Sequence, residues 1–314
     1  PLAATTNPEE IVYQSGDIVS QHGGLEPRLS MRLKTGPRSS IKAGVGRNLQ
    51  YIHLASLSPT SLPGDIWLPS SDRVDPQEGT QVSAGYFRDF GADRNIEFSF
   101  ELYHKWLTNL VAYREGSSPE DNVRNNVDNN LVFGDGTSYG AEFFLKRRRG
   151  DWTGWLGYTW SKTDRNFDDL NNGLPFPARY DRRHDMSLIL EWTLDDRWKL
   201  GGTFIYGTGN AITVPAQRYF LDGTLLDVYG PRNGFRMPAY HRADFGATHT
   251  PRPKGGKVRN GQWVFSVYNL YNRQNPYFIY FGNDGEISEG TLDIQAYQVS
   301  LFPILPSVTW NFKF

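Results

Sequence analysis

A two-residue alternation of apolar and charged side chains runs through most of this sequence. It is clearest in the segments RNIEFSFELYHKW and DMSLILEWTL and in the closing segment SVTWNFKF. Only His104 interrupts the apolar series in the first of these. Successive side chains of a β-strand point to opposite faces, so each segment predicts a strand with one apolar and one charged face.

Charged strand faces limit the architectures that such strands can build. An unpaired charge in the core of a β-sandwich costs several kcal/mol, whereas the lumen of a membrane barrel is polar. Aromatic residues make up 14 % of the chain, yet its mean hydropathy is −0.55. This interleaving of large rings with polar residues favours a transmembrane β-barrel, and a soluble sandwich is the weaker alternative.

Several other classes of protein are disfavoured by composition. The sequence has no apolar run of about 18 residues, so no membrane-spanning helix is predicted. A formal net charge of −1 gives no general attraction to nucleic acid. Without cysteine there is no disulfide framework and no thiolate metal site. The opening PLAATTNPEE has neither an initiator Met nor an apolar signal segment, and we expect a mature or truncated chain.

The connections between these strands alternate between short and long. Short turns near 35–38, 91–93 and 148–151 alternate with long segments such as 108–136 and 163–180. Outer-membrane barrels have short periplasmic turns and long extracellular loops. This pattern predicts an integral protein of the bacterial outer membrane, in contact with outer-membrane lipid.

Aromatic residues lie where the two surfaces of a membrane would meet the strands. Trp152, Trp198 and Trp263 each follow a short turn, and Trp160 and Tyr206 lie further along the first two strands. The intervening residues span roughly 26 Å at the rise of a β-strand. We therefore expect two aromatic girdles.

The alternation predicts an all-β fold with about eleven antiparallel strands. These are 27–35, 38–54, 77–90, 94–107, 137–149, 151–162, 181–194, 196–208, 239–250, 260–281 and 294–314. Single-chain bacterial barrels have an even number of strands, and an open edge cannot be satisfied in lipid. We expect residues 27–314 to form the C-terminal half of a larger barrel and residues 1–26 to be the rest of an extracellular loop.

Several stretches resemble a known family in collinear order. They include SIKAGVGRNLQYIHLAS, GWLGYTWSKTDR, NNGLPFPARYDRRHDMSL, NGFRMPAYHRADFGATHTP, VYNLYNRQNPYFIYF and QVSLFPILPSVTWNFKF. They resemble the C-terminal half of TonB-dependent outer-membrane receptors, in particular the group with a carboxypeptidase-like regulatory N-terminal domain. The resemblance implies a barrel of about 22 strands closed by an N-terminal plug. Set against this family, we expect residues 1–314 to contain neither the plug nor the TonB box nor the first barrel strands.

The resemblance also implies partners. The TonB energy-transducing complex would act through the missing N-terminal part, and a surface lipoprotein is a further candidate partner. The aromatic C-terminus resembles the signal read by the barrel-assembly machinery. The residues assigned to this signal are Trp310, Phe312 and Phe314.

Strand parity places a set of charged residues on the lumen face. Their expected role is structural, as charge pairs and as hydrogen-bond partners of the plug. The set is Arg28, Arg32, Lys42, Glu97, Glu101, Lys105, Glu142, Lys146, Asp185, Glu191, Lys199, Arg242 and Asp244.

A ligand site is expected at the outer mouth, where long loops enter the strands. The segment YDRRHD mixes aromatic and charged side chains just before a strand. Aromatic rings near the other loops could stack on a ligand. The candidate substrate-binding residues are Tyr180, Asp181, Arg183, Trp67, Tyr277 and Tyr280.

Two shorter motifs favour ordinary structure over chemistry. GTSYG at 136–140 matches G-x-S-x-G, but a strand follows Ser138 where a nucleophile elbow requires a helix. Asp164, Asn166 and Asp168 have calcium-loop spacing, but the required Gly and Glu are absent, so a calcium ion is the weaker alternative. The scattered His residues show no metal-ligand spacing, and no cofactor is predicted.

Three functions are compatible with this sequence. The favoured one is TonB-dependent active import of a scarce ligand, without covalent chemistry. The alternative is a structural barrel that scaffolds a multi-protein complex. An enzyme barrel is third, because no convergent set of catalytic residues can be assembled.

Overall fold

The computed structural model describes residues 14–55, 66–91, 93–115, 127–221, 224–252, 261–284 and 293–312. Antiparallel strands dominate it, and the two short helices, η1 (Val127–Asn130) and η2 (Asn171–Gly173), are single 3₁₀ turns. None of the described helical segments has the length and apolar character needed to cross a bilayer.

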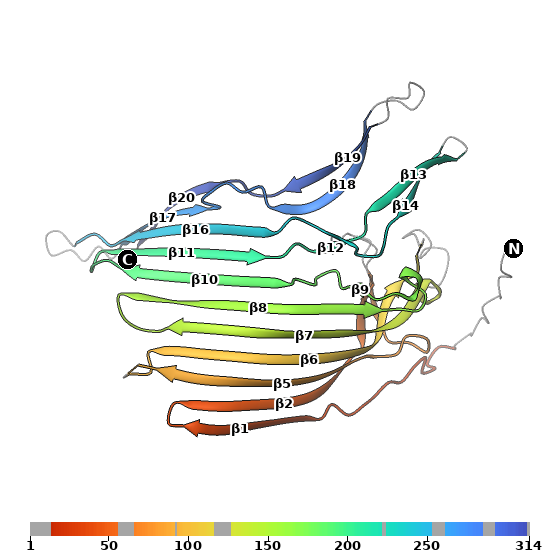
Figure 1. Ribbon diagram of the computed structural model, residues 1–314, viewed down its shortest axis with the longest axis horizontal. Coiled ribbons are helices and arrows are strands. Elements are labelled where there is room, and N and C mark those ends of the chain that lie inside the picture. The colour runs from red at the N-terminus through yellow and green to blue at the C-terminus, as the bar shows by residue number, and fades with distance from the viewer. Residues whose placement is uncertain are drawn as a thin grey trace.

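Eleven long strands form one curved sheet in nearly sequential order (Figure 1), which we call the wall. The strands are β1 (Arg28–Gly36), β2 (Ser39–Gln50), β5 (Gln77–Phe90), β6 (Ile96–Tyr113), β7 (Leu131–Arg147), β8 (Trp152–Asn166), β10 (His184–Thr193), β11 (Trp198–Gly207), β16 (Tyr240–His249), β17 (Gly261–Tyr268) and β20 (Leu305–Phe312). Every neighbouring pair is antiparallel. The sheet is open, with β1 and β20 at its two edges. The predicted all-β antiparallel fold is thus confirmed.

Short turns lie at one end of the wall and long connections at the other (Figure 1). The long connections carry β9 (Phe176–Pro177), which pairs with β8, and separate small hairpins. We call this end the mouth. Its hairpins are β3 (Ile52–Ala55) with β4 (Ile66–Pro69), β12 (Ala211–Ile212) with β15 (Phe235–Arg236), β13 (Pro215–Leu221) with β14 (Thr224–Tyr229), and β18 (Pro276–Asp284) with β19 (Asp293–Ser300).

Three of the predicted strands are broken where the chain leaves the wall. The strand expected at 38–54 ends at Gln50, and Ile52 begins the β3–β4 hairpin. The strand expected at 260–281 divides because Asn269 and Asn272 have positive φ angles of 53° and 54°. The one expected at 294–314 divides at Phe302, with φ 53°, just before Pro303. A positive φ is uncommon outside glycine and lies outside the β region, and at these positions the chain turns away from the wall. Beyond them, β18 and β19 pair with each other.

The apolar face of the wall is continuous from edge to edge. The pairing places Leu33, Ile41, Tyr86, Phe100 and Phe143 in one row across five strands. Many of its members are more than a third exposed, although they are large and apolar. Such a face is suited to the hydrocarbon of a bilayer.

Aromatic residues line this apolar face at two levels. Near the short turns, ring centroids lie 4.6 Å apart in Trp152–Trp192, 4.4 Å in Trp198–His249 and 4.6 Å in Trp263–Trp310. Towards the mouth, the pairs Tyr139–Trp160 and Tyr206–His241 lie 5.9 and 6.3 Å apart. The two expected girdles are therefore present.

His104 belongs to the aromatic girdle nearer the mouth and does not disrupt the apolar series. Its ring lies 4.3 Å from Trp106 and 5.8 Å from Tyr139, measured between centroids. The sequence pattern marked it as a break because His is polar, but its flat ring packs like its aromatic neighbours.

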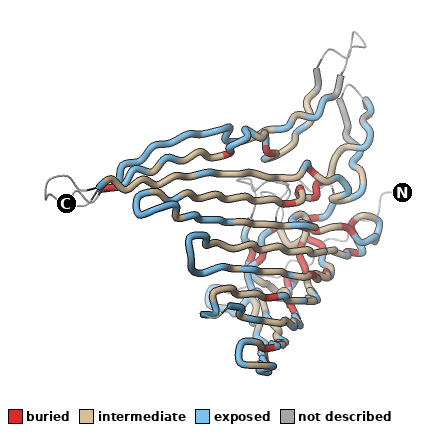
Figure 2. Tube along the Cα trace, turned by 60° about the vertical axis from the view of Figure 1, so that its left-hand side comes forward, coloured by how far each residue is buried: buried red, intermediate tan, exposed pale blue. Residues whose placement is uncertain are grey.

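Buried apolar side chains gather at the mouth (Figure 2). One cluster joins the β3–β4 hairpin to the outer ends of β6 and β7, through Ala55, Leu68, Val111 and Leu131. A second cluster packs Phe167, Leu170 and Phe176 of the β8–β10 connection against Leu110 and Val132. The loops therefore carry their own small cores.

Candidate functional site: the charged face and the mouth

The predicted charged residues share one face of the wall. The register joins Arg32 to Lys42, Lys42 to Gly85, Gly85 to Glu101, and Glu101 to Glu142. From Glu142 the same row continues through Thr159 to Asp185. The other members of the predicted set lie on the same face. On strands of this row they are an even number of residues from it, and on the remaining strands they pair opposite residues of that face.

Charge changes sign along this row. Arg32 and Lys42 lie at one end, while Glu101, Glu142 and Asp185 lie further along. Glu101 and Glu142 are directly opposite each other, an arrangement that destabilises an isolated sheet. Together with Asp185 they line a recess of about 240 Å³.

Many of the other charges on this face are paired. Arg148 donates to Glu97 at 2.7 Å, and Arg242 donates to Asp244 at 2.9 Å. Longer pairs join Arg182 to Asp185 at 3.5 Å and Lys199 to Glu191 at 3.9 Å; at the edge strand, Arg28 lies 3.3 Å from Glu26. Lys42 lies over the ring of Phe87, 3.7 Å from its centroid.

Asp181 is the best-connected polar residue at the mouth. Its side chain is fully buried and accepts hydrogen bonds from Arg236, from Arg183 at 3.4 Å and from the amide of Thr163 at 2.7 Å. The Arg236 guanidinium also donates to the Asp181 carbonyl. This enclosed and engaged carboxylate joins the loops of the mouth. Substrate binding by Asp181 stays a prediction.

Arginines surround this junction. Arg179 lies 4.9 Å from the ring centroid of Tyr180. Arg232 lies 5.7 Å from the ring of Phe176, whose backbone pairs with Arg165. Burial lowers the pKa of Arg232 below its usual value, while the carboxylate of Glu115 acts in the opposite sense. The mouth is thus rich in guanidinium groups.

The sequence did not point to Arg232 or Arg236. Both lie in the long β11–β16 connection, and Arg236 is 55 positions from its partner Asp181. No periodic spacing links the two segments. An unusual density of arginine in both loops was the only available signal.

The predicted aromatic residues belong to different parts of the mouth. Tyr180 is 65 % exposed beside the arginines, and Trp67 is 66 % exposed on β4. Tyr277 and Tyr280 are about half exposed on β18, which leaves the wall near its β20 edge. Tyr277 and Tyr280 make ring contacts within the β18–β19 hairpin, and Tyr180 makes its ring contact with Arg179. The structure therefore does not bring these rings into one cluster.

The assembly-signal residues end the wall. Trp310 is opposite Trp263, and Phe312 is opposite Gly261, so both continue the apolar face. Phe314 lies outside the described residues. The assignment of an assembly signal stays a prediction.

The two shorter motifs form no reactive site. Ser138 lies inside β7 and shares a hydrogen bond of 2.8 Å with Thr163, so GTSYG is not a nucleophile elbow. Asp164 pairs with Lys162 at 2.6 Å. Within the described part of the chain, no group of three or more His, Asp or Glu residues could hold a metal. The calcium alternative stays a prediction.

Comparison with known proteins adds evidence of ancestry. No curated protein matches the chain in sequence. Among solved structures, the ferric-catecholate import receptor Fiu of E. coli K12 shares 13 % identity with a TM-score of 0.55, over 91 % of this chain and 34 % of that one. The ferric yersiniabactin uptake receptor FyuA of Yersinia pestis shares 12 % identity with a TM-score of 0.56, over 91 % of this chain and 37 % of that one.

The ferripyoverdine receptor of Pseudomonas aeruginosa shares 13 % identity with a TM-score of 0.54, over 82 % of this chain and 30 % of that one. The chain thus spans about a third of the receptors that it matches. These likenesses establish the fold alone. In sequence, residues 7–270 match the family described as TonB dependent receptor-like, beta-barrel. The chain therefore belongs to this family, whose members are outer-membrane receptors and transporters that work with TonB and are not enzymes.

Proposed function

We propose that the protein takes part in TonB-dependent active import of a scarce ligand across the outer membrane. The observation that carries this proposal is the charged face, which runs from β1 to β16 along the wall of a chain that belongs to the TonB-dependent receptor barrel family. In such a barrel the apolar face meets lipid and the polar face lines the lumen. The charged set then faces a plug.

The sign change along the lumen row supports contact with a plug. Glu101 and Glu142 face each other without an opposite charge between them in the register. Basic side chains of a plug would relieve this repulsion. Lumen charges that are already paired, such as Arg242 with Asp244, instead stiffen the wall.

Ligand binding is assigned to the mouth. Arg183 and Tyr180 enter from the β8–β10 connection, and the buried Asp181 between them fixes their backbone. Trp67, Tyr277 and Tyr280 approach from separate hairpins, so they would touch only a ligand large enough to span the mouth. A guanidinium beside exposed rings suits a ligand with anionic and planar groups.

Uptake by the full-length protein tests this proposal. Cells lacking their own iron receptors would express it with and without functional TonB and would be offered a panel of radiolabelled ferric siderophores. Accumulation that requires TonB supports import. In the Arg183→Ala and Tyr180→Ala variants we expect accumulation to fall about tenfold, because charged hydrogen bonds and stacking are worth one to two powers of ten together.

Arg197→Ala is the matched control, since Arg197 is an exposed arginine in the short turn between β10 and β11. It should transport normally. If no ligand accumulates and a surface lipoprotein purifies stably with the barrel, the scaffold function replaces import. A carboxypeptidase-like domain upstream would support the narrower group assignment.

A further inference from the structure

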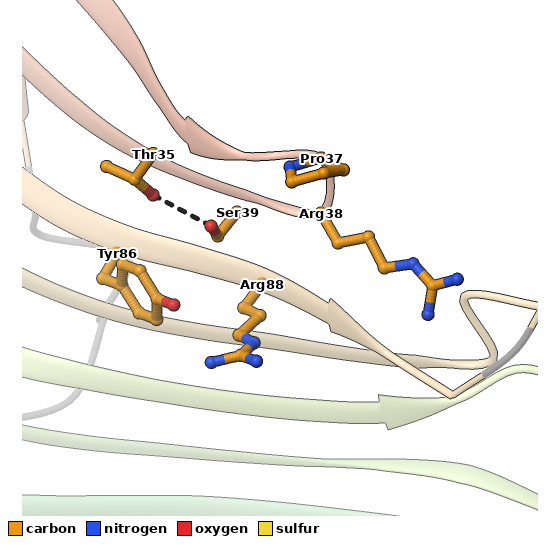
Figure 3. A pocket seen from close by; sticks show the side chains of 6 residues that line it. All are labelled: Thr35, Pro37, Arg38, Ser39, Tyr86 and Arg88. Atoms are coloured by element: carbon orange, nitrogen blue, oxygen red, sulfur yellow. Dashed lines mark hydrogen bonds between the residues drawn. The ribbon is translucent and has the colours of Figure 1, made fainter.

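A recess of about 510 Å³ lies at the short-turn end of the wall, far from the mouth. It is lined by Thr35, Pro37, Arg38, Ser39, Tyr86 and Arg88 (Figure 3). These residues come from β1, β2, the turn that joins them, and β5. The import function uses none of them.

The recess opens on the apolar face of the wall. Ser39 is opposite Arg88, and Ile41 is opposite Tyr86, so Arg88 shares its face with Tyr86. Leu33 is opposite Ile41 on the same face. Arg88 is therefore a charged residue on the lipid-facing surface, where arginine is costly at mid-membrane and tolerated only near the interface.

Arg88 lies at the level of the membrane surface. The β5–β6 ladder ends with the pair Phe90 and Ile96, only two residues beyond Arg88. Short turns of this family's barrels face the periplasm, so the recess is at the headgroup level of the periplasmic leaflet. This placement rests on membrane orientation and does not depend on transport.

Among the described residues, no carboxylate balances the charge of Arg88. Its guanidinium lies over the ring of Phe90, 4.8 Å from the centroid, and among the described residues no carboxylate is within salt-bridge distance. Arg38 is held at the rim by donating to the carbonyl of Gly91. Both arginines thus line the recess, Arg88 beside Tyr86 and Arg38 at the rim with its side chain extending away from Arg88 (Figure 3).

Hydroxyl groups complete the lining. The Thr35 hydroxyl donates to the Ser39 hydroxyl at 2.9 Å, and the Tyr86 phenol lies beside Arg88 (Figure 3). Every one of these groups can donate a hydrogen bond, and the described lining contains no carboxylate. Guanidinium and hydroxyl donors together suit the oxygens of a phosphate.

We propose that this recess binds the phosphate headgroup of an anionic glycerophospholipid of the periplasmic leaflet. Arg88 and Arg38 contact the phosphate oxygens, and the acyl chains follow the apolar row that includes Leu33 and Ile41. The bound lipid then seals the β1–β2 turn against β5. General attraction between surface arginine and the membrane is the competing explanation, and it requires no recess.

Native mass spectrometry of the full-length protein tests the site. The protein would be released from nanodiscs made of phosphatidylglycerol or of phosphatidylcholine, and retained lipid would be counted. We expect retained phosphatidylglycerol and about tenfold weaker retention in Arg88→Gln, the loss of one charge-assisted contact. Circular dichroism would establish that the variant is folded.

Arg197→Gln is the matched control, because it removes the same charge from another short turn. It should retain lipid like the unchanged protein. Equal losses in both variants, or equal retention of the two lipids, would overturn the proposal. In a third arm, inorganic phosphate is added in excess. Displacement of the lipid would mean that the recess is a free-phosphate site and would also overturn the proposal. Continued retention of the lipid would support a lipid site.

Discussion

The wall and the mouth of this protein are stabilised in opposite ways. The wall exposes large apolar side chains on one face and charges on the other, so it has almost no core of its own. The mouth holds the buried apolar residues, including Phe167, Leu170 and Tyr113, and the buried Asp181. The wall therefore depends on its solvent, while the mouth depends on its internal packing.

This difference separates two roles within one chain. A wall that is satisfied by lipid and by backbone pairing tolerates sequence change within its two-residue pattern. A mouth built on specific buried contacts holds its loops in one arrangement, as a preformed ligand site requires. Each prediction below changes one region and leaves the other as an internal control.

The largest effect is expected for Phe167→Ala in the mouth. This ring is fully buried, packs on Phe176 with centroids 6.0 Å apart, and approaches Gly134 so closely that a Cβ there would lie 2.5 Å from it. Removing it should cost about 3–5 kcal/mol of local stability. Hydrogen exchange should rise in 167–176 and 131–134 and stay unchanged near the short turns. An equal rise in hydrogen exchange at the mouth and near the short turns would contradict the idea that wall and mouth are stabilised separately.

The next effect is expected for Leu102→Arg in the wall. Leu102 is 51 % exposed on the apolar face, between the two girdles. An arginine there should destabilise the folded barrel by about 2–4 kcal/mol in a bilayer. The measurement is urea unfolding of the full-length protein in lipid vesicles. Glu101→Arg, its neighbour on the charged face, is the control and should cost far less; comparable losses would refute the assignment of the two faces.

A smaller loss is expected for Asp181→Asn. It keeps the shape of the side chain but removes the charge that Arg236 and Arg183 share. Since both arginines are partly exposed, we expect a loss of about 1–3 kcal/mol, confined to the mouth. Limited proteolysis of the 164–183 and 208–239 connections should quicken. Unchanged cleavage would remove Asp181 from its holding role.

The smallest effects are expected from changes in pH. The mouth and the wall should lose stability in different pH ranges. Burial lowers the pKa of His53, in the β3–β4 hairpin, below its usual value. The unfolded state then binds more protons, so stability of the hairpin is complete above about pH 6.5 and is lost as pH falls through the lowered pKa. Protection of this hairpin should decrease below about pH 6.5, and His53→Gln should abolish that dependence.

The short turn between β10 and β11 should respond only to stronger acid. Amide N–H groups of Arg197 and Trp198 donate to Asp195 at 2.7 and 2.8 Å and lower the pKa of its carboxyl. Its stabilising effect is complete above about pH 4 and is lost as pH falls through the lowered pKa. Exchange of the turn amides measures this. If amide exchange in this turn and in the β3–β4 hairpin rose over the same pH range, the two regions would not differ in their pH dependence as predicted.

The wall was predictable because lipid and water impose the two-residue pattern directly on the sequence. Even so, the sequence pattern gives no information about the partner of a strand. It joined β18 to the wall strand expected at 260–281, whereas β18 pairs with β19 in the mouth. The mouth was less predictable, because no two-residue pattern governs its loops. Its contacts, such as Arg236 with Asp181, join distant loop segments whose sequences have no period.

The β8–β10 and β11–β16 connections of the mouth are joined by several contacts besides Asp181. Ala211 donates to the carbonyl of Arg179 at 3.1 Å, the Asn233 side chain donates to that of Pro177 at 2.9 Å, and the amide of Arg232 donates to Asn171 at 3.0 Å. Neither loop can therefore be exchanged between related receptors without the other. Recombination that transfers ligand preference between receptors must therefore exchange the β8–β10 and β11–β16 connections together, as one unit.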